Sequence, residues 1–216
     1  MKGLNSVIPT KEIAAVAEKV LEFDMKIQHS TTEYLGQYGR HLKALSQEDR
    51  YTRFGFQAND SSVDQLMLNV LYNSADHHIF TYYKDDHIVG FGHLAREGDA
   101  WQLAVSVEKA YQGQGIAGEL MSYMIDWGKI HNVESVYMHC ITENKKIQHL
   151  SRKHGLKTVE RTGTEITAQV QLPEPTVADY TANFVREQSG LATDIVRLQR
   201  AWLKNWVSPL SSTVDN

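Results

Sequence analysis

The segment YQGQGIAGEL, residues 111–120, places three glycines within ten residues, just where a helix is predicted to begin. Glycine lets the backbone turn tightly and come close to a ligand. In such a loop, successive N–H groups point at an anion, and the dipole of the helix that follows adds positive potential. The segment therefore predicts a phosphate-binding loop, and its surroundings must identify the phosphate.

In the literal frame, Gly113, Gly115 and Gly118 match the G-x-G-x-x-G fingerprint of nicotinamide dinucleotide-binding folds. Those folds need a parallel βαβ unit and an acidic residue about 20 residues further on, at the end of the next strand. Here the preceding strands are predicted to be antiparallel, Glu134 stands at the start of the next strand, and Glu143 lies beyond it. A nucleoside triphosphate loop is not favoured either, because no Gly-Lys-Ser/Thr sequence follows the glycines.

Periodicity and turn residues divide the rest of the chain into helices and strands. Helices are expected at 10–23, 31–45, 62–73, 116–130 and 144–155, with another helical turn within 46–56 and two more helices within 176–207. Strands are expected at 25–30, 78–83, 87–95, 100–107 and 133–141, with two more in 156–172 around a turn at Thr162–Gly163. The short turns KDD and REGD predict an antiparallel meander between residues 78 and 107. The expected fold is α+β, an α/β sandwich: a mixed, mostly antiparallel sheet flanked by helices, with additional helices at both ends.

The overall charge and hydropathy argue against several function classes. The 216 residues carry a net charge of −4 and no block of lysines or arginines, so a nucleic-acid partner is not expected. No segment approaches the ~18 apolar residues of a membrane span, and the N-terminus lacks the apolar core of a signal peptide. The simplest expectation is a cytoplasmic protein with neither a nucleic-acid nor a membrane partner.

The spacing of cysteine and histidine predicts no metal site. Cys140 is the only cysteine, so neither an intrachain disulfide nor a four-thiolate zinc site can form. His77 and His78 are adjacent in the chain and cannot both point the same way on a strand, while His149 and His154 are five residues apart, off a common helix face. The sequence contains no H-E-x-x-H motif.

Shifted by one residue, the loop becomes Gln112-Gly113-Gln114-Gly115-Ile116-Ala117, a Q-x-x-G-x-A pattern. This pattern resembles the coenzyme A pyrophosphate loop of the GNAT N-acetyltransferase superfamily, in which Gln or Arg is followed by two residues, Gly, one residue, and Gly or Ala. The surrounding segments point to the same family. LAVSVEKAYQGQGIAGELM (103–121) resembles its central strand, loop and helix, NKKIQHLSRKHGLK (144–157) its next motif, and LSQEDRYTRFGF (45–56) an early helical segment of one branch.

The resemblance covers residues 26–172, which are expected to form the acetyltransferase domain between helical extensions at 1–25 and 173–216. In the family, the central strand and the next strand splay apart, and the pantetheine arm of acetyl-CoA, the acyl donor, pairs with the central strand. The resemblance gives that place to Val105, Ser106 and Val107. It places the pyrophosphate on the backbone N–H groups of Gln112, Gly113, Gln114, Gly115, Ile116, Ala117 and Gly118. Asn144 matches an asparagine that helps hold the cofactor arm, and it also suits a helix N-cap.

The chemistry implied is acyl transfer from a thioester to an amine, in which the amine must lose a proton and the thiolate benefits from gaining one. The chain departs from the common family pattern at both positions, because Gln102 aligns with a glutamate base and Ser151 with a tyrosine acid. If REGD closes a tight hairpin, His93 lies directly opposite Gln102 and can act as the base, directly or through a water that Gln102 holds. His139 is a second candidate, and a structural role is the alternative for both histidines.

The sequence is compatible with three functions. The first is N-acetylation of a primary amine on a small cationic molecule, such as a polyamine or an aminoglycoside-like compound. The second is acetylation of a protein lysine or N-terminus, because LSQEDRYTRFGF is similar to relatives fused to acyl-CoA ligases, some of which acetylate protein lysines. The third is a non-catalytic acyl-CoA-binding module, which Gln102 and Ser151 favour.

The C-terminal segment carries an apolar seam, formed by Leu191, Ile195, Leu198, Trp202 and Trp206. Residues three or four apart lie on one face of a helix. The seam predicts packing against the protein's own surface, and a homodimer contact through the C-terminal helices is the alternative.

Overall fold

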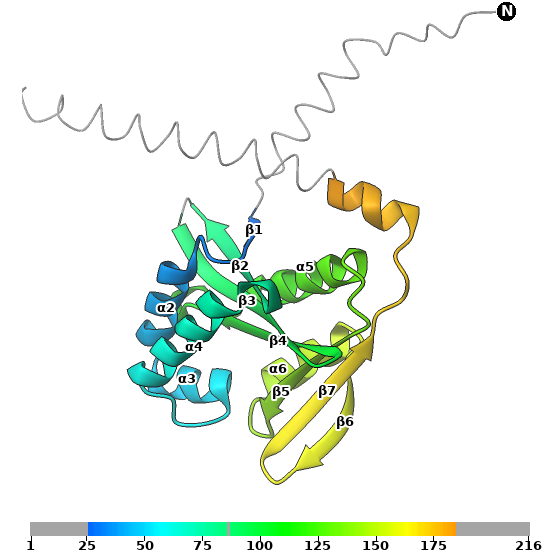
Figure 1. Ribbon diagram of the computed structural model, residues 1–216. Helices are drawn as coiled ribbons and strands as arrows, with labels where there is room; N and C mark the ends of the chain where they lie inside the picture. Colours follow the sequence, from blue (N-terminus) through cyan, green and yellow to red (C-terminus); the bar gives the residue numbers. More distant parts are fainter. Residues whose placement is uncertain (1–25, 86, 185–216) are drawn as a thin grey trace, which may run out of the picture. The chain divides into compact units, whose positions relative to one another are not determined.

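The computed structural model describes residues 26–85 and 87–184, which Figure 1 draws as a ribbon. One compact unit spans Lys26–Asn183. Three expectations lie outside the described residues: the helix at 10–23, the apolar seam with its homodimer contact, and most of the two terminal extensions. The domain boundaries after residues 25 and 172 stay a prediction.

Seven strands form one mixed sheet, in the order β1-β2-β3-β4-β5-β7-β6. The strands are β1 (Ile27–Ser30), β2 (His77–Lys84), β3 (His87–Glu97), β4 (Ala100–Val107), β5 (Ser135–Ile141), β6 (Lys157–Thr162) and β7 (Glu165–Gln171). Every neighbouring pair is antiparallel except β4 and β5, which are parallel. The sheet and the meander of β2, β3 and β4 confirm the expected mixed, mostly antiparallel architecture.

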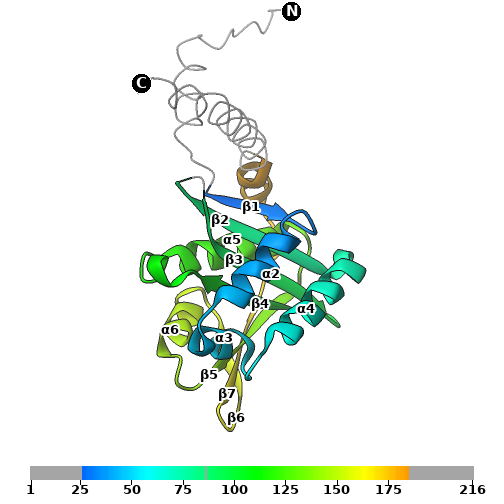
Figure 2. The same ribbon diagram turned by 90° about the vertical axis from the view of Figure 1, so that its left-hand side faces the viewer.

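Helices cover both faces of the sheet, as Figures 1 and 2 show together. The helices are α2 (Leu35–Ala44), α3 (Gln47–Phe54), α4 (Asp60–Tyr72), α5 (Ile116–Ile130) and α6 (Lys145–Lys153), with short 3-10 turns η1 (Ser74–Asp76) and η2 (Lys109–Tyr111). One apolar cluster lies between the sheet and α5 and α6, and includes Leu120 and Met124. A smaller cluster lies between the sheet and α2 and α4, and includes Tyr38 and Val63. Residues 177–184 are also helical.

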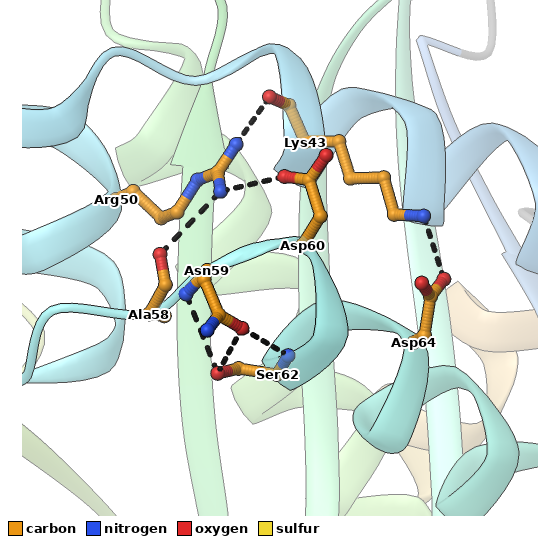
Figure 3. Close-up of polar contacts among 7 residues, drawn as sticks. All are labelled: Lys43, Arg50, Ala58, Asn59, Asp60, Ser62 and Asp64. Atoms are coloured by element: carbon orange, nitrogen blue, oxygen red, sulfur yellow. Dashed lines mark hydrogen bonds and ion pairs between the residues drawn. The ribbon is translucent and has the colours of Figure 1, made fainter.

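The corner between α3 and α4 is fixed by side chains that cap or join the helices (Figure 3). Asn59 and Ser62 form a capping box at the start of α4, in which Asn59 Oδ1 accepts from the Ser62 N–H at 2.9 Å. Arg50 on α3 donates to Asp60 Oδ1 at 2.8 Å and to the backbone carbonyl of Lys43 on α2. These contacts hold α3 beside α2 and α4.

The β3–β4 hairpin differs from expectation in its register. The turn has two residues and begins at Gly98 (φ +62°), so β3 continues past the start of the predicted REGD turn. His93 therefore pairs with Ala104, and the prediction that it lies directly opposite Gln102 is wrong. Because side chains alternate with period two, the shift leaves His93 and Gln102 on the same face of the sheet.

Candidate active site

β4 and β5 separate along their length and open the sheet near its centre. The two strands pair only at Trp101–Val136 and Gln102–Tyr137. Beyond Gln102, within the described residues, β4 keeps its pairing with β3 as far as Val107 and has none with β5. The predicted cofactor segment Val105–Val107 lies in this part of β4. One edge of its backbone is therefore not used by the sheet and can pair with an extended ligand.

The loop between β4 and α5 has the backbone geometry of an anion cradle. Gly113 and Gly115 have φ of +78° and +86°, in the left-handed region that favours glycine. A Cβ atom on either residue would meet nothing within 4 Å, so the loop borders open space. Intrahelical bonding in α5 begins with Gly118, whose N–H donates to the Gly115 carbonyl at 2.9 Å. The amides of Gly115, Ile116 and Ala117 are those that a helix leaves without an internal partner, so they can bind an anion.

Some members of the predicted cradle are engaged elsewhere. Gly118 uses its N–H within the helix, and a Cβ there would lie 3.3 Å from Leu150 Cδ1 of α6. Ile116 buries its side chain in the core, and the Gln112 N–H donates to the Lys109 carbonyl at 3.4 Å. These residues shape the loop and seat α5 against its neighbours.

Side chains tie the loop to neighbouring elements. Gln112 Nε2 donates to Asp49 Oδ1 of α3 at 3.1 Å and to the Val107 carbonyl at 3.2 Å. Gln114 Oε1 accepts a hydrogen bond from Lys84 Nζ at the end of β2. Lys84 thereby places a positive charge beside the loop, which favours a phosphate ligand.

A cavity of about 310 Å³ lies where β4 and β5 separate. Residues of α3, α4 and five strands form its wall. Those with polar side chains include Arg53, Asn69, His77, His93, Glu97, Gln102, His139 and Glu165. Three of the four predicted catalytic residues are among them, so the fold brings them to one place.

His93 is buried in the cavity wall and hydrogen-bonded to His77. His93 Nε2 lies 3.0 Å from His77 Nδ1, and the two rings stack with centroids 5.1 Å apart. His77 Nε2 in turn lies 3.1 Å from Asn69 Nδ2. Burial, together with the nearby charge of Arg53, holds the pKa of His93 well below its usual range, so the ring is neutral at pH 7.

The other predicted catalytic residues have different surroundings. His139 is exposed and lines the cavity from β5, two residues past the last pair with β4, and its Nδ1 lies 3.0 Å from Thr167 Oγ1. Gln102 lines the cavity from that last pair. Ser151 is buried outside the cavity lining, and its hydroxyl donates to a backbone carbonyl within α6 at 3.0 Å.

Two predicted cofactor residues form hydrogen bonds within the protein. Asn144 caps α6, because its Oδ1 accepts from the Ile147 N–H at 3.1 Å. Ser106 Oγ lies 2.9 Å from His41 Nε2, and both side chains are buried. The Ser106 side chain therefore anchors β4 to α2, which leaves its backbone as the part that could meet a ligand.

Sequence reasoning missed Arg53, Asn69 and His77 as cavity residues. Arg53 stands three residues after Arg50 on α3, and both have the same residue type and helical context. Only the tertiary structure shows that Arg50 pairs with Asp60 while Arg53 lines a cavity. No local sequence signal separates the two arginines.

The described residues of this site provide neither a metal-binding cluster nor a reactive thiol. Among residues 26–85 and 87–184, no group of three His, Cys, Asp or Glu side chains is placed to hold a metal ion. Cys140 is buried in the cavity wall, and burial raises the pKa of its thiol, which disfavours the reactive thiolate.

No helix in the described part of the chain has the length and apolar character needed to cross a membrane.

Comparison with family models gives one match, to the acetyltransferase (GNAT) family, over residues 42–156. This range includes the glycine loop, the separating strands and the helix that Asn144 caps. No curated protein matches the sequence significantly.

Solved structures share the fold at low sequence identity. The GNAT domain of PAT from S. lividans has a TM-score of 0.58 at 14% identity, covering 68% of this chain and 89% of that one. The PaiA N-acetyltransferase from Thermoplasma acidophilum, solved with coenzyme A, has a TM-score of 0.53 at 14% identity, with 67% and 98% covered. The spermidine N-acetyltransferase from Vibrio cholerae, solved with CoA and spermine, has a TM-score of 0.54 at 14% identity, with 69% and 97% covered.

Proposed function

The chain belongs to the GNAT acetyltransferase family, and from that premise we propose that it is an acetyl-CoA-dependent N-acetyltransferase acting on a primary amine. One observation carries the proposal: β4 and β5 separate beside a left-handed glycine loop, and a cavity lies at the point of separation. The open strand edge, the anion cradle and the cavity would hold the arm of the donor, its phosphates and the acceptor. Acyl transfer gains much of its rate from placing two substrates side by side.

The donor would bind along the free edge of β4 and at the start of α5. In this proposal, the backbone of Val105–Val107 pairs with the pantetheine arm, and the loop from Gln112 to Gly118 surrounds the pyrophosphate, which the amides of Gly115, Ile116 and Ala117 bind. Lys84 adds charge beside the loop. Asn144 holds the cofactor arm in addition to capping α6, where its cap bond is already formed. Acetyl-CoA supplies an activated acyl group as a thioester.

The reaction forms a C–N bond and breaks a C–S bond. The amine nitrogen attacks the carbonyl carbon, the thiolate departs and takes up a proton, and the amine loses its protons to a base and then to solvent. The overall change converts an ammonium group and a thioester into an amide, a thiol and a proton. The protein must therefore supply a proton acceptor near the cavity.

His139 is the base that the geometry favours. Its ring is exposed at the cavity on β5, whereas His93 Nε2 is already engaged by His77. Gln102 lies across the separating strands and would hold a water between the amine and the base. Ser151 as the thiolate acid stays a prediction, although its hydroxyl already donates within α6.

The acceptor in this proposal is a small cationic amine, with polyamines and aminoglycoside-like compounds as first candidates. Glu97 and Glu165 line the cavity, and their carboxylates attract ammonium groups. The Vibrio cholerae protein of the same fold, solved with spermine, gives a precedent for such an acceptor. A protein lysine or N-terminus is the alternative acceptor, and a non-catalytic acyl-CoA-binding module is the alternative function.

Turnover with a panel of amines tests the proposal. The purified full chain is incubated with acetyl-CoA and diamines, aminoglycosides, amino acids, peptides and proteins, while free thiol is measured and products are identified by mass spectrometry. The proposal expects thiol release that depends on a small amine and matches the acetylated product in amount. Acetylation of peptides or proteins alone would favour the alternative acceptor, and tight CoA binding without any turnover would favour the binding module.

Replacement of His139 tests its role as base. His139→Gln keeps a polar contact for Thr167 but cannot take up a proton near pH 7, so kcat should fall about 100-fold or more. The KM for acetyl-CoA should stay within about twofold. A wild-type kcat in this variant would rule His139 out.

A further inference from the structure

A directed chain of hydrogen bonds determines which nitrogen of His93 carries its proton. The backbone carbonyl of Asn69 can only accept, so the Asn73 atom 3.2 Å away is the donor Nδ2. The same Nδ2 lies 2.7 Å from the Asn69 side chain, which fixes that atom as the accepting Oδ1. Asn69 Nδ2 therefore donates to His77 Nε2 at 3.1 Å, and neutral His77 donates from Nδ1 to His93 Nε2 at 3.0 Å.

His93 is left with a proton on Nδ1. A neutral imidazole has one donor and one acceptor nitrogen, and the acceptor, Nε2, is already used by His77. Because His93 lines the cavity, Nδ1–H is the group it can offer to a ligand there. A buried N–H suits an oxygen acceptor on the ligand and does not serve as a base.

Arg53 supplies a second donor group to the same cavity. Its Nη2 donates to the Tyr38 hydroxyl at 2.7 Å, and its Nε is buried without a hydrogen-bond partner. In the described part of the chain, Arg53 forms no ion pair, whereas Arg50 on the same helix is paired with Asp60 (Figure 3). Although Glu97 and Glu165 are in the same wall, neither is ion-paired with Arg53, so its guanidinium favours a carboxylate on the ligand, whose two oxygens match the planar guanidinium.

We propose that the acceptor amine also carries a carboxylate, which Arg53 and the Nδ1–H of His93 bind together. The proposal rests on the proposed function and narrows its acceptor to an amino acid, with a diamino acid as the best fit. The cavity of about 310 Å³ lies at the small end of the ~300–1,000 Å³ range of ligand pockets, so it can hold a free diamino acid. Glu97 and Glu165 in the same wall would hold its ammonium groups.

Lysine and 1,5-diaminopentane differ only in the carboxylate, so comparing them isolates this group. If Glu97 and Glu165 alone selected the acceptor, the dicationic diaminopentane would be preferred, because lysine has the lower net positive charge. If Arg53 and His93 bind the carboxylate, kcat/KM should favour lysine by about 10- to 100-fold, as expected for a hydrogen bond between charged groups.

Four variants assign the preference to these residues. Arg53→Met keeps an unbranched side chain without the charge, and the ratio of kcat/KM for lysine to that for diaminopentane should fall to about 1 or below. His93→Leu should lower the ratio, and His93→Gln, which keeps an oxygen for His77 and an N–H for the ligand, should retain part of it. Arg96→Met is the matched control, because Arg96 lies on β3 with an exposed side chain that does not line the cavity, and the ratio should stay at the wild-type value.

Calorimetric titration of both amines into the CoA-saturated full chain measures the same preference without chemistry. If no amine is turned over, the proposed function fails, but tighter binding of lysine that Arg53→Met abolishes still supports the carboxylate site. If lysine is bound and turned over no better than diaminopentane, the proposed carboxylate site is wrong. A lysine preference of unchanged size in Arg53→Met overturns it as well.

Discussion

His93 and His139 both line the cavity, and a neutral imidazole has one nitrogen that can accept a proton, so the sequence offers two candidate bases. What distinguishes them is the direction of their hydrogen bonds. His77 donates to Nε2 of His93, whereas His139 is hydrogen-bonded to the Thr167 hydroxyl, packs edge-on against the Tyr137 ring and stays exposed. Sequence spacing places both histidines on central strands, but it cannot place Asn69 beside His77, because that contact depends on how α4 lies against β2.

The glycines of the loop show that the sequence can predict the backbone conformation of single residues. Gly115 has φ +86° at the N-cap of α5, and alanine there costs about 1–2 kcal/mol in backbone strain. Its Cβ would project into the space where the phosphates are proposed to bind, since no protein atom lies within 4 Å. Gly115→Ala should therefore raise the KM for acetyl-CoA by about tenfold or more and leave the KM of the amine nearly unchanged.

Gly98→Ala is the matched control for this loop variant. Gly98 also has positive φ, +62°, and a Cβ there also meets nothing within 4 Å, but it lies in the β3–β4 turn. Both variants should lose a similar amount of stability in urea unfolding, and only Gly115→Ala should change the KM for acetyl-CoA. The same KM in the two variants would mean that the loop does not contact the donor.

Helix α3 is joined to the loop by side chains on both. Ser46 caps α3, accepting from the Asp49 N–H at 3.0 Å, and Asp49 Oδ1 accepts from Gln112 Nε2 at 3.1 Å. Because Arg53 is on the same helix, this bridge links the proposed donor site to the proposed acceptor site. We expect the bridge to hold the two sites in a fixed relation.

A double-mutant cycle tests the bridge between α3 and the loop. Asp49→Ala and Gln112→Ala should couple by about 1 kcal/mol in urea unfolding, as for a hydrogen bond to a charged and partly exposed group. Lys109 provides the comparison pair, since its Nζ lies 3.7 Å from Asp49 Oδ2 with an exposed side chain. The Asp49–Lys109 coupling should stay below about 0.5 kcal/mol. Equal coupling in the two pairs would show that the Gln112 bond adds nothing.

Sequence patterns predicted the elements of residues 26–172 better than their pairing. The helix at 116–130 and the strand at 100–107 have the observed bounds, because a glycine loop and clear periodicity mark their ends. The predicted β3–β4 register differs from the observed one, because REGD is compatible with both a two-residue and a four-residue turn. The cavity could not be predicted from these patterns, because its wall combines α3, α4 and five strands.

His41 and His78 lie on opposite faces of the sheet, His41 buried and His78 partly buried. His41 is hydrogen-bonded to Ser106 on the α2 side, and burial, together with the charge of Arg53, lowers the pKa of His41 to about 4. His78 lies against Trp127 on the α5 side, and burial is the main cause that lowers its pKa to about 4. In an unfolded chain, both rings return to a pKa of about 6.5.

These shifts predict that folding stability falls on acidification. Between about pH 6.5 and about pH 4 the unfolded chain binds more protons than the folded one, so the stabilisation is complete above this range and is lost as the pH falls through it. The free energy of unfolding measured in urea should therefore decrease from about pH 7.5 to about pH 5, by up to about 1.4 kcal/mol per pH unit for His41 and by less for the more exposed His78. His41→Gln keeps a hydrogen bond to Ser106 without a titrating group, so its decrease should be shallower. Parallel curves for the variant and the wild type would show that His41 does not contribute to the acid sensitivity of the fold.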